Sequence, residues 1–273
     1  MSKNESELNW CQRMVIEEHE KLSPRLIYEI IRKHGIEELN RPAKALIFSG
    51  ITAGIIISFS FVFKATFKAY LPDSEWAFLV ENIGYTVGFI IVILGHMQLF
   101  TENTITTVVP LFSPFTYRKL YQLIRLWGIV FISNIIGTGL AAYFILNNHL
   151  FDQNIIQQLD TIAFHVTSYS ITENIIKGIP AGILIASLVW MLPSVKNKVL
   201  LIFFITYLMA LGGFTHVIVG SSEAAYWFYK DNLSFSHYLF TFLFPTTFGN
   251  IIGGTGVFTL LIYGQVNEEL GGE

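Results

Sequence analysis

The residues best placed for chemistry are a histidine and a carboxylate in apolar surroundings. His216 lies within residues 199–222, which contain no Asp, Glu, Lys or Arg, and Glu102 follows a second such stretch, residues 82–101. An ionisable group in a membrane-length apolar segment is by default a candidate functional site. Because histidine both donates and accepts hydrogen bonds and titrates near neutral pH, His216 suits the binding of a small anion or the transfer of a proton.

Other kinds of site have little support in the sequence. No nucleophile–base pair and no metal-ligand spacing is visible, so we expect neither an enzyme nor a metal or cofactor site. The net charge of −3 leaves no basic field for nucleic acid. Cys11 is the single cysteine, which excludes a disulfide scaffold, and we expect it to be a free cytosolic thiol.

The composition is typical of a membrane protein. Hydrophobic residues make up 52% of the 273 residues and charged residues 14%, against about 25% charged residues in soluble domains. The alternation of β-barrel strands is absent, and residues 1–40 contain no apolar core of a signal peptide. Six charge-free stretches approach or exceed the roughly 20 residues that cross a bilayer as a helix: 45–63, 82–101, 126–151, 178–195, 199–222 and 232–267. We therefore expect an all-α membrane protein with six transmembrane helices.

The basic residues predict the orientation of these spans. Eight of the 17 Lys and Arg residues precede the first span, and more lie in the loops around Arg118 and Lys196, whereas none lies between residues 126 and 176. Because basic residues favour the cytoplasmic side, both termini are predicted to be cytoplasmic in a plasma (inner) membrane. Three lysines are exceptions that fall on the outer side: Lys64, Lys68 and Lys230.

The membrane part is flanked by two tails. Residues 1–43 are predicted to form a cytoplasmic amphipathic tail, residues 44–267 the six-span membrane domain, and residues 268–273 a second cytoplasmic tail. In the first tail, Ser23 is predicted to cap a helix that ends at Gly35. We expect its apolar face to lie on the bilayer or on a neighbouring subunit; a regulatory gate is an open alternative.

Two segments repeat within the chain. Residues 50–57 and 178–185 agree at six of eight positions, and the Asn-Ile-Ile-Gly of residues 134–137 reappears at residues 250–253. Spans 1–3 and 4–6 thus look like copies, and three spans per copy make the second copy inverted. Inverted repeats place a pathway between the halves, near the membrane midplane. The Gly-x-x-x-Gly pairs in these segments favour close helix packing.

The second span of each half is expected to be interrupted. Residues 98–104 and 211–222 contain polar groups and glycines that fit poorly in lipid. Irregular backbone at membrane depth is tolerated only where it is buried in protein or lines a cavity, and paired interruptions indicate a transport site. The amides of Asn134 and Asn250 are predicted to satisfy backbone groups freed at these breaks. His96, close to the first break, is expected to be structural or vestibular.

Two orientations of Glu102 remain open. Its carboxyl group is either a buried brace of the first break or a group that faces the pore. The buried orientation is favoured if the substrate is an anion, because a carboxylate in the pore would repel it.

Four motifs together resemble the formate/nitrite transporter family. They span roughly residues 40–265: Leu99-Phe100-Thr101, Gly213-Phe214-Thr215-His216, Asn134-Ile135-Ile136-Gly137 and Gly249-Asn250-Ile251-Ile252-Gly253-Gly254. The resemblance implies an aquaporin-like fold, a homopentamer, and one pore per protomer for small monovalent anions. It also implies that Thr101 and His216 form a central polar pair, flanked by apolar side chains near Leu99, Phe100 and Met209.

The sequence also departs from the family pattern. Gly182 and Gly220 stand where the family usually has Asn, and Val166 aligns with a lysine of the vestibule. Thr215 replaces an often acidic residue before the histidine, and Glu102 is unusual after Leu-Phe-Thr. The sequence therefore resembles a divergent, YfdC-like branch, for which the resemblance implies the fold but no particular substrate.

Three functions are open at this point. The favoured one is a homopentameric channel or transporter for a small monovalent anion or its weak acid, in which Thr101 and His216 donate hydrogen bonds and His216 passes a proton. The second is a cation- or proton-conducting relative that uses Glu102. The third is a non-conducting membrane scaffold or sensor, which filled space beside Gly182 and Gly220 would favour.

Overall fold

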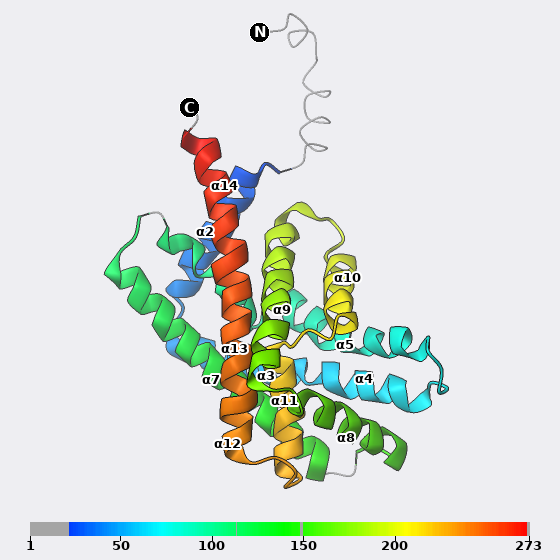
Figure 1. The fold of residues 1–273 in the computed structure, drawn as a ribbon. Coiled ribbons are helices and arrows are strands. Elements are labelled where there is room, and N and C mark those ends of the chain that lie inside the picture. The colour runs from blue at the N-terminus through cyan, green and yellow to red at the C-terminus, as the bar shows by residue number, and fades with distance from the viewer. Residues whose placement is uncertain (1–21, 113, 148–149, 272–273) are drawn as a thin grey trace, which may run out of the picture.

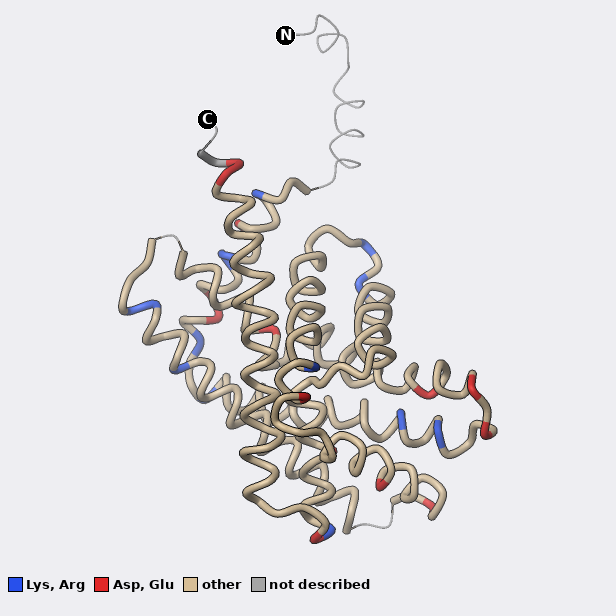
Figure 2. The backbone as a smooth tube through the Cα atoms, in the orientation of Figure 1, with Lys and Arg blue, Asp and Glu red and all other residues tan. Residues whose placement is uncertain are grey.

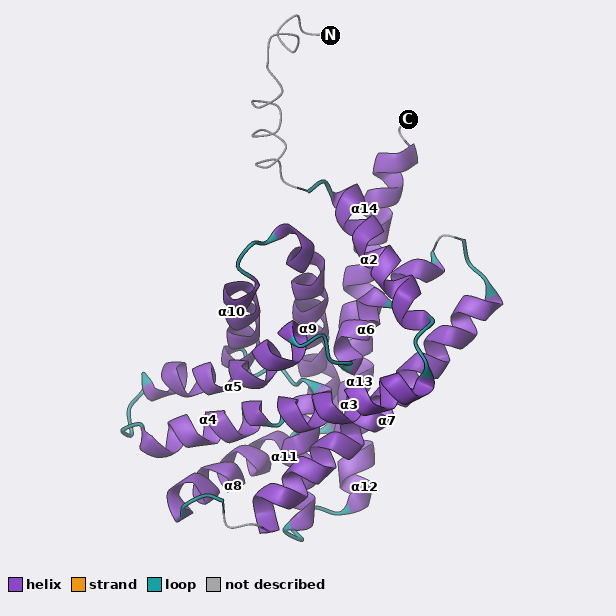
Figure 3. Cartoon of the chain, turned by 180° about the vertical axis from the view of Figure 1, so that it is seen from behind, coloured by secondary structure: helices purple, strands orange, loops and turns teal. Residues whose placement is uncertain are grey.

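The computed structural model describes residues 22–112, 114–147 and 150–271, and all regular elements in these ranges are helical (Figures 1 and 3). Among the described residues, five helical stretches are long and apolar enough to cross a membrane: Ala43–Tyr70, Ala77–Leu94, Tyr117–Asn147, Ile171–Ser194 and Phe235–Glu269. The predicted fifth span contributes the shorter apolar helix Lys198–Leu211. The all-α prediction is therefore confirmed. Cys11, with the rest of residues 1–21, lies outside the described residues.

The first half of the chain supplies three spans. Its elements are α3 (Ala43–Ile57), α4 (Phe59–Tyr70), α5 (Ala77–Leu94), α6 (Phe100–Thr106), the 3₁₀ turn η1 (Val109–Leu111) and α7 (Tyr117–Asn147). α3 and α4 join at Ser58, whose hydroxyl donates to the Gly54 carbonyl at 2.9 Å, a bond that often bends a helix. The charge-free stretch ended at residue 63, but the helix continues to Tyr70. Lys64 therefore lies within the helical span.

The second half supplies the other three spans. Its elements are α9 (Ile171–Met191), the 3₁₀ turn η2 (Leu192–Ser194), α10 (Lys198–Leu211), α11 (Val217–Tyr229), α12 (Phe235–His237), the π-helical segment η3 (Tyr238–Leu243), α13 (Phe244–Ile251), the π-helical segment η4 (Ile252–Thr259) and α14 (Leu260–Gly271). The last helix runs through the start of the predicted tail at 268–273.

A helix lies where the sequence suggested a connecting loop between spans 3 and 4. α8 (Gln153–Thr167) begins after Asp152, whose carboxylate accepts from the Ile155 N–H at 3.1 Å. Its apolar residues Ile155, Leu159 and Ile162 are buried on one face, which packs with α4 and α11. α8 thus has the amphipathic pattern of a helix that covers the bundle.

The helix in the N-terminal tail extends beyond its predicted end. α2 (Pro24–Leu39) is capped by Ser23, as predicted, with Ser23 Oγ accepting from the Leu26 N–H at 3.4 Å. Gly35 does not end the helix. It lies where α2 approaches so closely that a Cβ would collide with the Thr106 carbonyl. The buried face of α2 packs on its own chain, next to η1, α6, α7, α9 and α14.

The halves interlock in pairs of helices. α5 of the second span packs against α10 of the fifth, and α7 of the third span packs against α11 of the fifth. Within the halves, α3 packs on α7, and α9 on α13 and η4. Figure 2 shows that much of the chain carries no charge, whereas α4 has two lysines within it. These lysines, Lys64 and Lys68, lie on a helix that packs against α5 and α8, and both line the candidate site.

Candidate functional site

The two interrupted spans turn in the same way. Three backbone hydrogen bonds close each break, and every donor and acceptor of the second break lies 117 positions after its counterpart: Gly95 N to Ile91 O, His96 N to Ile93 O and Met97 N to Val92 O, then Gly212 N to Leu208 O, Gly213 N to Ala210 O and Phe214 N to Met209 O. At matching positions, His96 (φ 49°) and Gly213 (φ 60°) adopt the left-handed conformation. This conformation is costly for a residue with a Cβ, so His96 is held there by the rest of the turn.

The breaks are shorter than the sequence suggested, and they lie earlier in each segment. The first occupies residues 95–99 and the second residues 212–216, so most of the predicted breaks, 98–104 and 211–222, is helical. Polar side chains do not interrupt α6 because they bond to carbonyls one turn back. Thr104 Oγ1, for example, donates to the Thr101 carbonyl at 2.7 Å.

Asn134 and Asn250 hold the breaks in place through equivalent hydrogen bonds, as predicted. Asn134 Oδ1 accepts from the Phe100 N–H at 2.9 Å, and its Nδ2 donates to the carbonyls of Gly50 and Gln98, each at 2.8 Å. Asn250 Oδ1 accepts from the Val217 N–H at 3.0 Å, and its Nδ2 donates to the carbonyls of Gly178 and Thr215, each at 2.9 Å. Both amides are fully buried, so every donor and acceptor that they supply meets a backbone group.

Thr101 and His216 meet across the two breaks. Thr101 Oγ1 lies 2.7 Å from His216 Nε2, and the two residues are 1% and 2% exposed. His216 also caps α11, because its Nδ1 accepts from the Val219 N–H at 3.3 Å. A neutral imidazole that accepts at Nδ1 carries its proton on Nε2. His216 therefore donates to the Thr101 oxygen, which leaves the Thr101 hydroxyl proton to donate elsewhere.

Apolar side chains surround this polar contact. The ring of Phe89 lies edge-on to the imidazole, with ring centroids 4.9 Å apart. Leu99, at the end of the first break, is fully buried, and so are Val217 and Ile218 beside the histidine. The contact is thus a small polar centre in a dry environment, where hydrogen bonds are stronger than in water.

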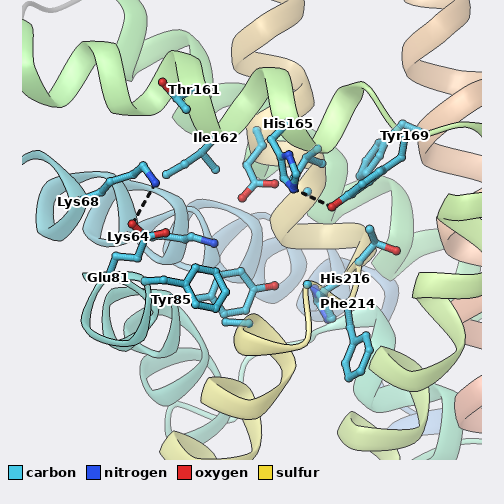
Figure 4. A pocket seen from close by; sticks show the side chains of 18 residues that line it. Lys64, Lys68, Glu81, Tyr85, Thr161, Ile162, His165, Tyr169, Phe214 and His216 are labelled. Atoms are coloured by element: carbon cyan, nitrogen blue, oxygen red, sulfur yellow. Dashed lines mark hydrogen bonds and ion pairs between the residues drawn. The ribbon is translucent and has the colours of Figure 1, made fainter. Parts of the chain in front are cut away.

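A cavity of about 330 Å³ opens on the His216 side of this centre, and we name it the Lys64 cavity. Side chains from α4, α5, α8 and α11 and from the second break converge on it (Figure 4). Its polar lining residues are Lys64 and Lys68 from α4, Glu81 and Tyr85 from α5, Thr161 and His165 from α8, Tyr169 from the turn after α8, Thr215 and His216 from the break, and Glu223 from α11. Phe214, Val166 and Gly220 line it as well.

The charged groups of the Lys64 cavity differ in their partners. Lys68 Nζ and Glu81 Oε2 form an ion pair at 3.0 Å. His165 Nε2 lies 2.7 Å from the Tyr169 hydroxyl. Burial, and then the nearby lysines, lower the pKa of His165, so this imidazole is mainly neutral at pH 7. Lys64 extends from α4 toward the ring of Tyr85, with its Nζ 5.9 Å from the ring centroid (Figure 4).

A second cavity, of about 390 Å³, lies beside α2, and we name it the Glu102 cavity. It is lined by Leu99 and His96 from the first break, by Glu102 from α6, and by Glu38 from α2. Gln98 Nε2 donates to Glu38 Oε2 at 2.7 Å, which ties α2 to the break. Glu102 Oε1 is buried and has no hydrogen-bond partner within the described residues. Of the two predicted orientations, the structure thus shows Glu102 at a cavity and not as a hydrogen-bonded brace.

Three predicted pore residues, Phe100, Met209 and Gly182, line neither of the two cavities. The Phe100 ring packs edge-on against Trp127 and Phe131 of α7, with centroids 5.6 and 5.0 Å away, because its backbone is turned toward α7 by Asn134. Met209 is fully buried in the core and lines neither cavity. Gly182 is a packing glycine, since a Cβ there would collide with the Asn250 carbonyl of the neighbouring helix.

Gly220 has a different role from Gly182. It lines the Lys64 cavity, but the space beside its Cα is filled by the ring of Phe242, which a Cβ at Gly220 would strike. The space beside both glycines is therefore occupied, a feature that favours the scaffold alternative. Thr101, His216, Leu99, Glu102, Phe214 and Gly220 are the predicted site residues that do lie at the centre or at a cavity.

Sequence reasoning missed two charged residues of the site. The departure at Val166 suggested that the vestibule lacks a positive charge, yet Lys64 reaches the cavity that Val166 lines. Glu223 is the first residue after the charge-free stretch 199–222, and the sequence alone did not indicate that its side chain is buried, with 4% exposed. The signal for Lys64 was present, since it was one of three lysines on the wrong side of the orientation pattern.

Comparisons with known proteins show the family of the chain. The formate/nitrite transporter family matches residues 25–264. The inner membrane protein YfdC of Escherichia coli (strain K12) is 40% identical over 245 residues, which cover 89% of this chain and 79% of that protein. The formate channel FocA of Haemophilus influenzae is 28% identical over 241 residues, which cover 77% and 84% of the two chains.

A solved structure shows the same fold. The pentameric formate channel with formate bound matches with a TM-score of 0.70 at 22% identity and covers 82% of this chain and 97% of its own. The fold and the family match together identify a multi-pass membrane protein. The chain belongs to the formate/nitrite transporter family, a family of channels and transporters.

Proposed function

We propose that the chain forms a channel or transporter for a small monovalent anion, such as formate, or for its weak acid. The supporting observation is the hydrogen bond between Thr101 and His216. It joins the start of α6, just after the first break, to the end of the second break, and a cavity lies beside each break. Both breaks come from interrupted spans, where membrane transporters commonly place their substrate. The family relationship and the formate channels among its relatives support the same substrate class.

The centre acts by hydrogen bonding and by exclusion of charge. The Thr101 hydroxyl donates to the anion while its oxygen accepts from His216 Nε2. The start of α11 adds the positive end of a helix dipole beside His216. The surrounding apolar side chains, which include Phe89 and Leu99, raise the free-energy cost of passing an ion without its hydration shell. A neutral acid passes at a lower cost.

The geometry favours hydrogen bonding over proton relay at His216. The Nδ1 atom accepts the capping bond from Val219, so its lone pair is occupied. A relay through the ring needs a proton on Nδ1, and that proton would break the cap. We therefore assign to His216 the role of a neutral donor, in place of the proton transfer that the sequence suggested.

We further propose that the protein is a homopentamer in a plasma (inner) membrane, with one pore per protomer and both termini in the cytoplasm. Large apolar side chains are exposed along α7 and the last span and need a cover: Ile124, Ile132, Ile136, Leu140, Phe240, Phe244 and Phe248. Lipid and neighbouring protomers supply such a cover. The pentameric solved relative and the inner-membrane relative support the assembly and the location.

Proteoliposomes test the proposed function directly. The purified protein is reconstituted, and uptake of radiolabelled formate is compared with uptake by protein-free vesicles. We expect the uptake rate to saturate with formate concentration and to rise toward acidic pH, because the neutral acid has a lower desolvation cost at the apolar centre than the anion. Uptake no faster than in protein-free vesicles at any pH between 5 and 8 would exclude the proposal.

A second candidate function rests on the Glu102 cavity. Its acidic side chains are Glu102, Glu37 and Glu38, the last of which pairs with Arg41 at 3.1 Å. They outnumber the one lysine of the lining, Lys198, and would favour a cation over an anion. Flux of a monovalent cation into the same vesicles, measured with a cation-sensitive dye, separates the two functions. Absence of both fluxes would instead favour the closed scaffold, in keeping with the filled space beside Gly182 and Gly220.

A further inference from the structure

Two opposite charges face the Lys64 cavity without pairing. Lys64 lies in α4, in the last third of the first span, and Glu223 lies in the second half of the fifth span; both line this cavity. Among the described residues, neither has an ion-pair partner within 4.0 Å. Glu223 is 4% exposed and sits on α11, seven residues after His216. An unpaired buried charge is costly, so a position like this indicates that something else completes the site.

The other ionisable groups around the cavity do not balance these two charges. Lys68 is neutralised by Glu81 at 3.0 Å. His165 is hydrogen-bonded with Tyr169, and His216 is committed to Val219 and Thr101. The remaining group on the facing helix α5 is the phenol of Tyr85. The charge that the cavity offers to a ligand is therefore set by Lys64 and Glu223.

We propose that Lys64 binds the anion on entry and that Glu223 takes up a proton together with it, so that the cavity is loaded only with an anion–proton pair. This inference rests on the proposed function and assigns the site where the substrate is first bound. It places proton uptake at Glu223 rather than at His216.

Electrostatics links the two events. An anion beside Lys64 gains charge-assisted hydrogen bonds from the amine. The same anion repels an ionised Glu223, because like charges at short range in a poorly solvated cavity disfavour each other. A proton from the outer solution on Glu223 removes that repulsion. The bound anion and proton together carry no net charge. They can therefore move into the poorly hydrated region around Thr101 and His216 at a lower desolvation cost than the anion alone.

Formate binding to the purified full-length protein in detergent tests the inference without transport. The shift of the thermal unfolding midpoint with sodium formate, against sodium gluconate at equal ionic strength, reports binding because a ligand of the folded state stabilises it. We expect wild type to bind formate at least about tenfold more tightly at pH 5.5 than at pH 7.5, since a proton binds with the anion.

Two variants separate the roles of the two charges. Lys64→Met should weaken formate binding by about ten- to a hundredfold at both pH values, the range of one lost charge-assisted hydrogen bond, and Lys64→Arg should restore it. Glu223→Gln, which resembles the protonated acid, should bind as tightly at pH 7.5 as at pH 5.5. Lys230→Met is the matched control, because Lys230 pairs with Asp160 at 2.7 Å away from the cavity.

The outcomes are distinct. Binding by Lys64→Met equal to wild type, the wild-type pH dependence in Glu223→Gln, or no formate-induced shift in wild type would each overturn the inference. The pH dependence in Glu223→Gln is decisive, because binding of preformed formic acid alone would preserve it. If binding follows the expected pattern but vesicles show no formate uptake, the inference stands and the proposed transport function fails.

Discussion

The side chains of Asn134 and Asn250 make the same three backbone hydrogen bonds in the two halves of the chain. Each side chain accepts from the first N–H of the helix that follows a break. It donates to two carbonyls, one in the first span of its half and one in the break. Each amide thus ties the end of a break to a neighbouring span. The position of Thr101 and His216 depends on these two ties.

Asn134→Ala and Asn250→Ala should each destabilise the protein strongly. Each change strands one buried N–H and the buried carbonyl of the break, Gln98 or Thr215, and a stranded buried group costs about 1–3 kcal/mol. We expect a loss of the folded assembly or a large drop in the thermal unfolding midpoint, measured in detergent. Asn147→Ala is the control, since its exposed amide donates only to the Tyr143 carbonyl at 2.9 Å. Equal midpoints for Asn147→Ala and the buried variants would contradict this account.

Substitutions at the matching left-handed positions should act in opposite directions. Gly213→Ala forces a Cβ into φ 60° and should cost about 1–2 kcal/mol of unfolding free energy. His96→Gly relieves the same strain at φ 49°, which outweighs the roughly 0.5–1 kcal/mol of added backbone entropy. Thermal unfolding should therefore show a lower midpoint for Gly213→Ala and an unchanged or higher one for His96→Gly. A lower midpoint for His96→Gly would show that its side chain stabilises the break more than its backbone strains it.

Docking of α2 should depend on the small size of Gly35. Gly35→Ala places a methyl group against the Thr106 carbonyl and Pro110, so α2 must shift. We expect faster protease cleavage within α2 than in wild type. Gly128→Ala, where a Cβ meets nothing within 4 Å, should cleave like wild type. Identical cleavage of both variants would mean that α2 is not held in this position.

The orientation follows from accessibility of single cysteines in a Cys11→Ser background. A cysteine at Asn154, exposed at the start of α8, should react with an impermeant maleimide on intact cells. A cysteine at Lys196, exposed in the loop before α10, should react only after permeabilisation. The reverse pattern would overturn the positive-inside argument.

Residue patterns predicted the fold better than the site. Charge-free stretches located the spans, and the repeated Asn-Ile-Ile-Gly motif identified Asn134 and Asn250 because a buried amide has few alternatives to binding backbone. The same patterns placed the breaks too late, since side chains such as Thr104 look disruptive in sequence yet bond within α6.

The direction of a side chain was beyond the reach of sequence patterns. Phe100 lies between Leu99 and Thr101 in the chain. Its backbone N–H donates to Asn134, and its ring packs against Phe131 of α7. Lys64 and Glu223 are 159 positions apart, and only the packing of α4 and α11 around one cavity relates them.

The central claim is that the hydrogen bond between His216 and Thr101 controls passage of the anion. The most direct measurement is the initial rate of formate uptake by proteoliposomes that contain wild type, His216→Asn or Thr101→Val. Asparagine keeps the cap of α11, since it is a strong N-cap residue, but is too short to retain the 2.7 Å contact with Thr101. We predict that both variants keep the wild-type assembly and lose about ten- to a hundredfold in rate, the range for one buried hydrogen bond. Wild-type rates in both variants would contradict the account.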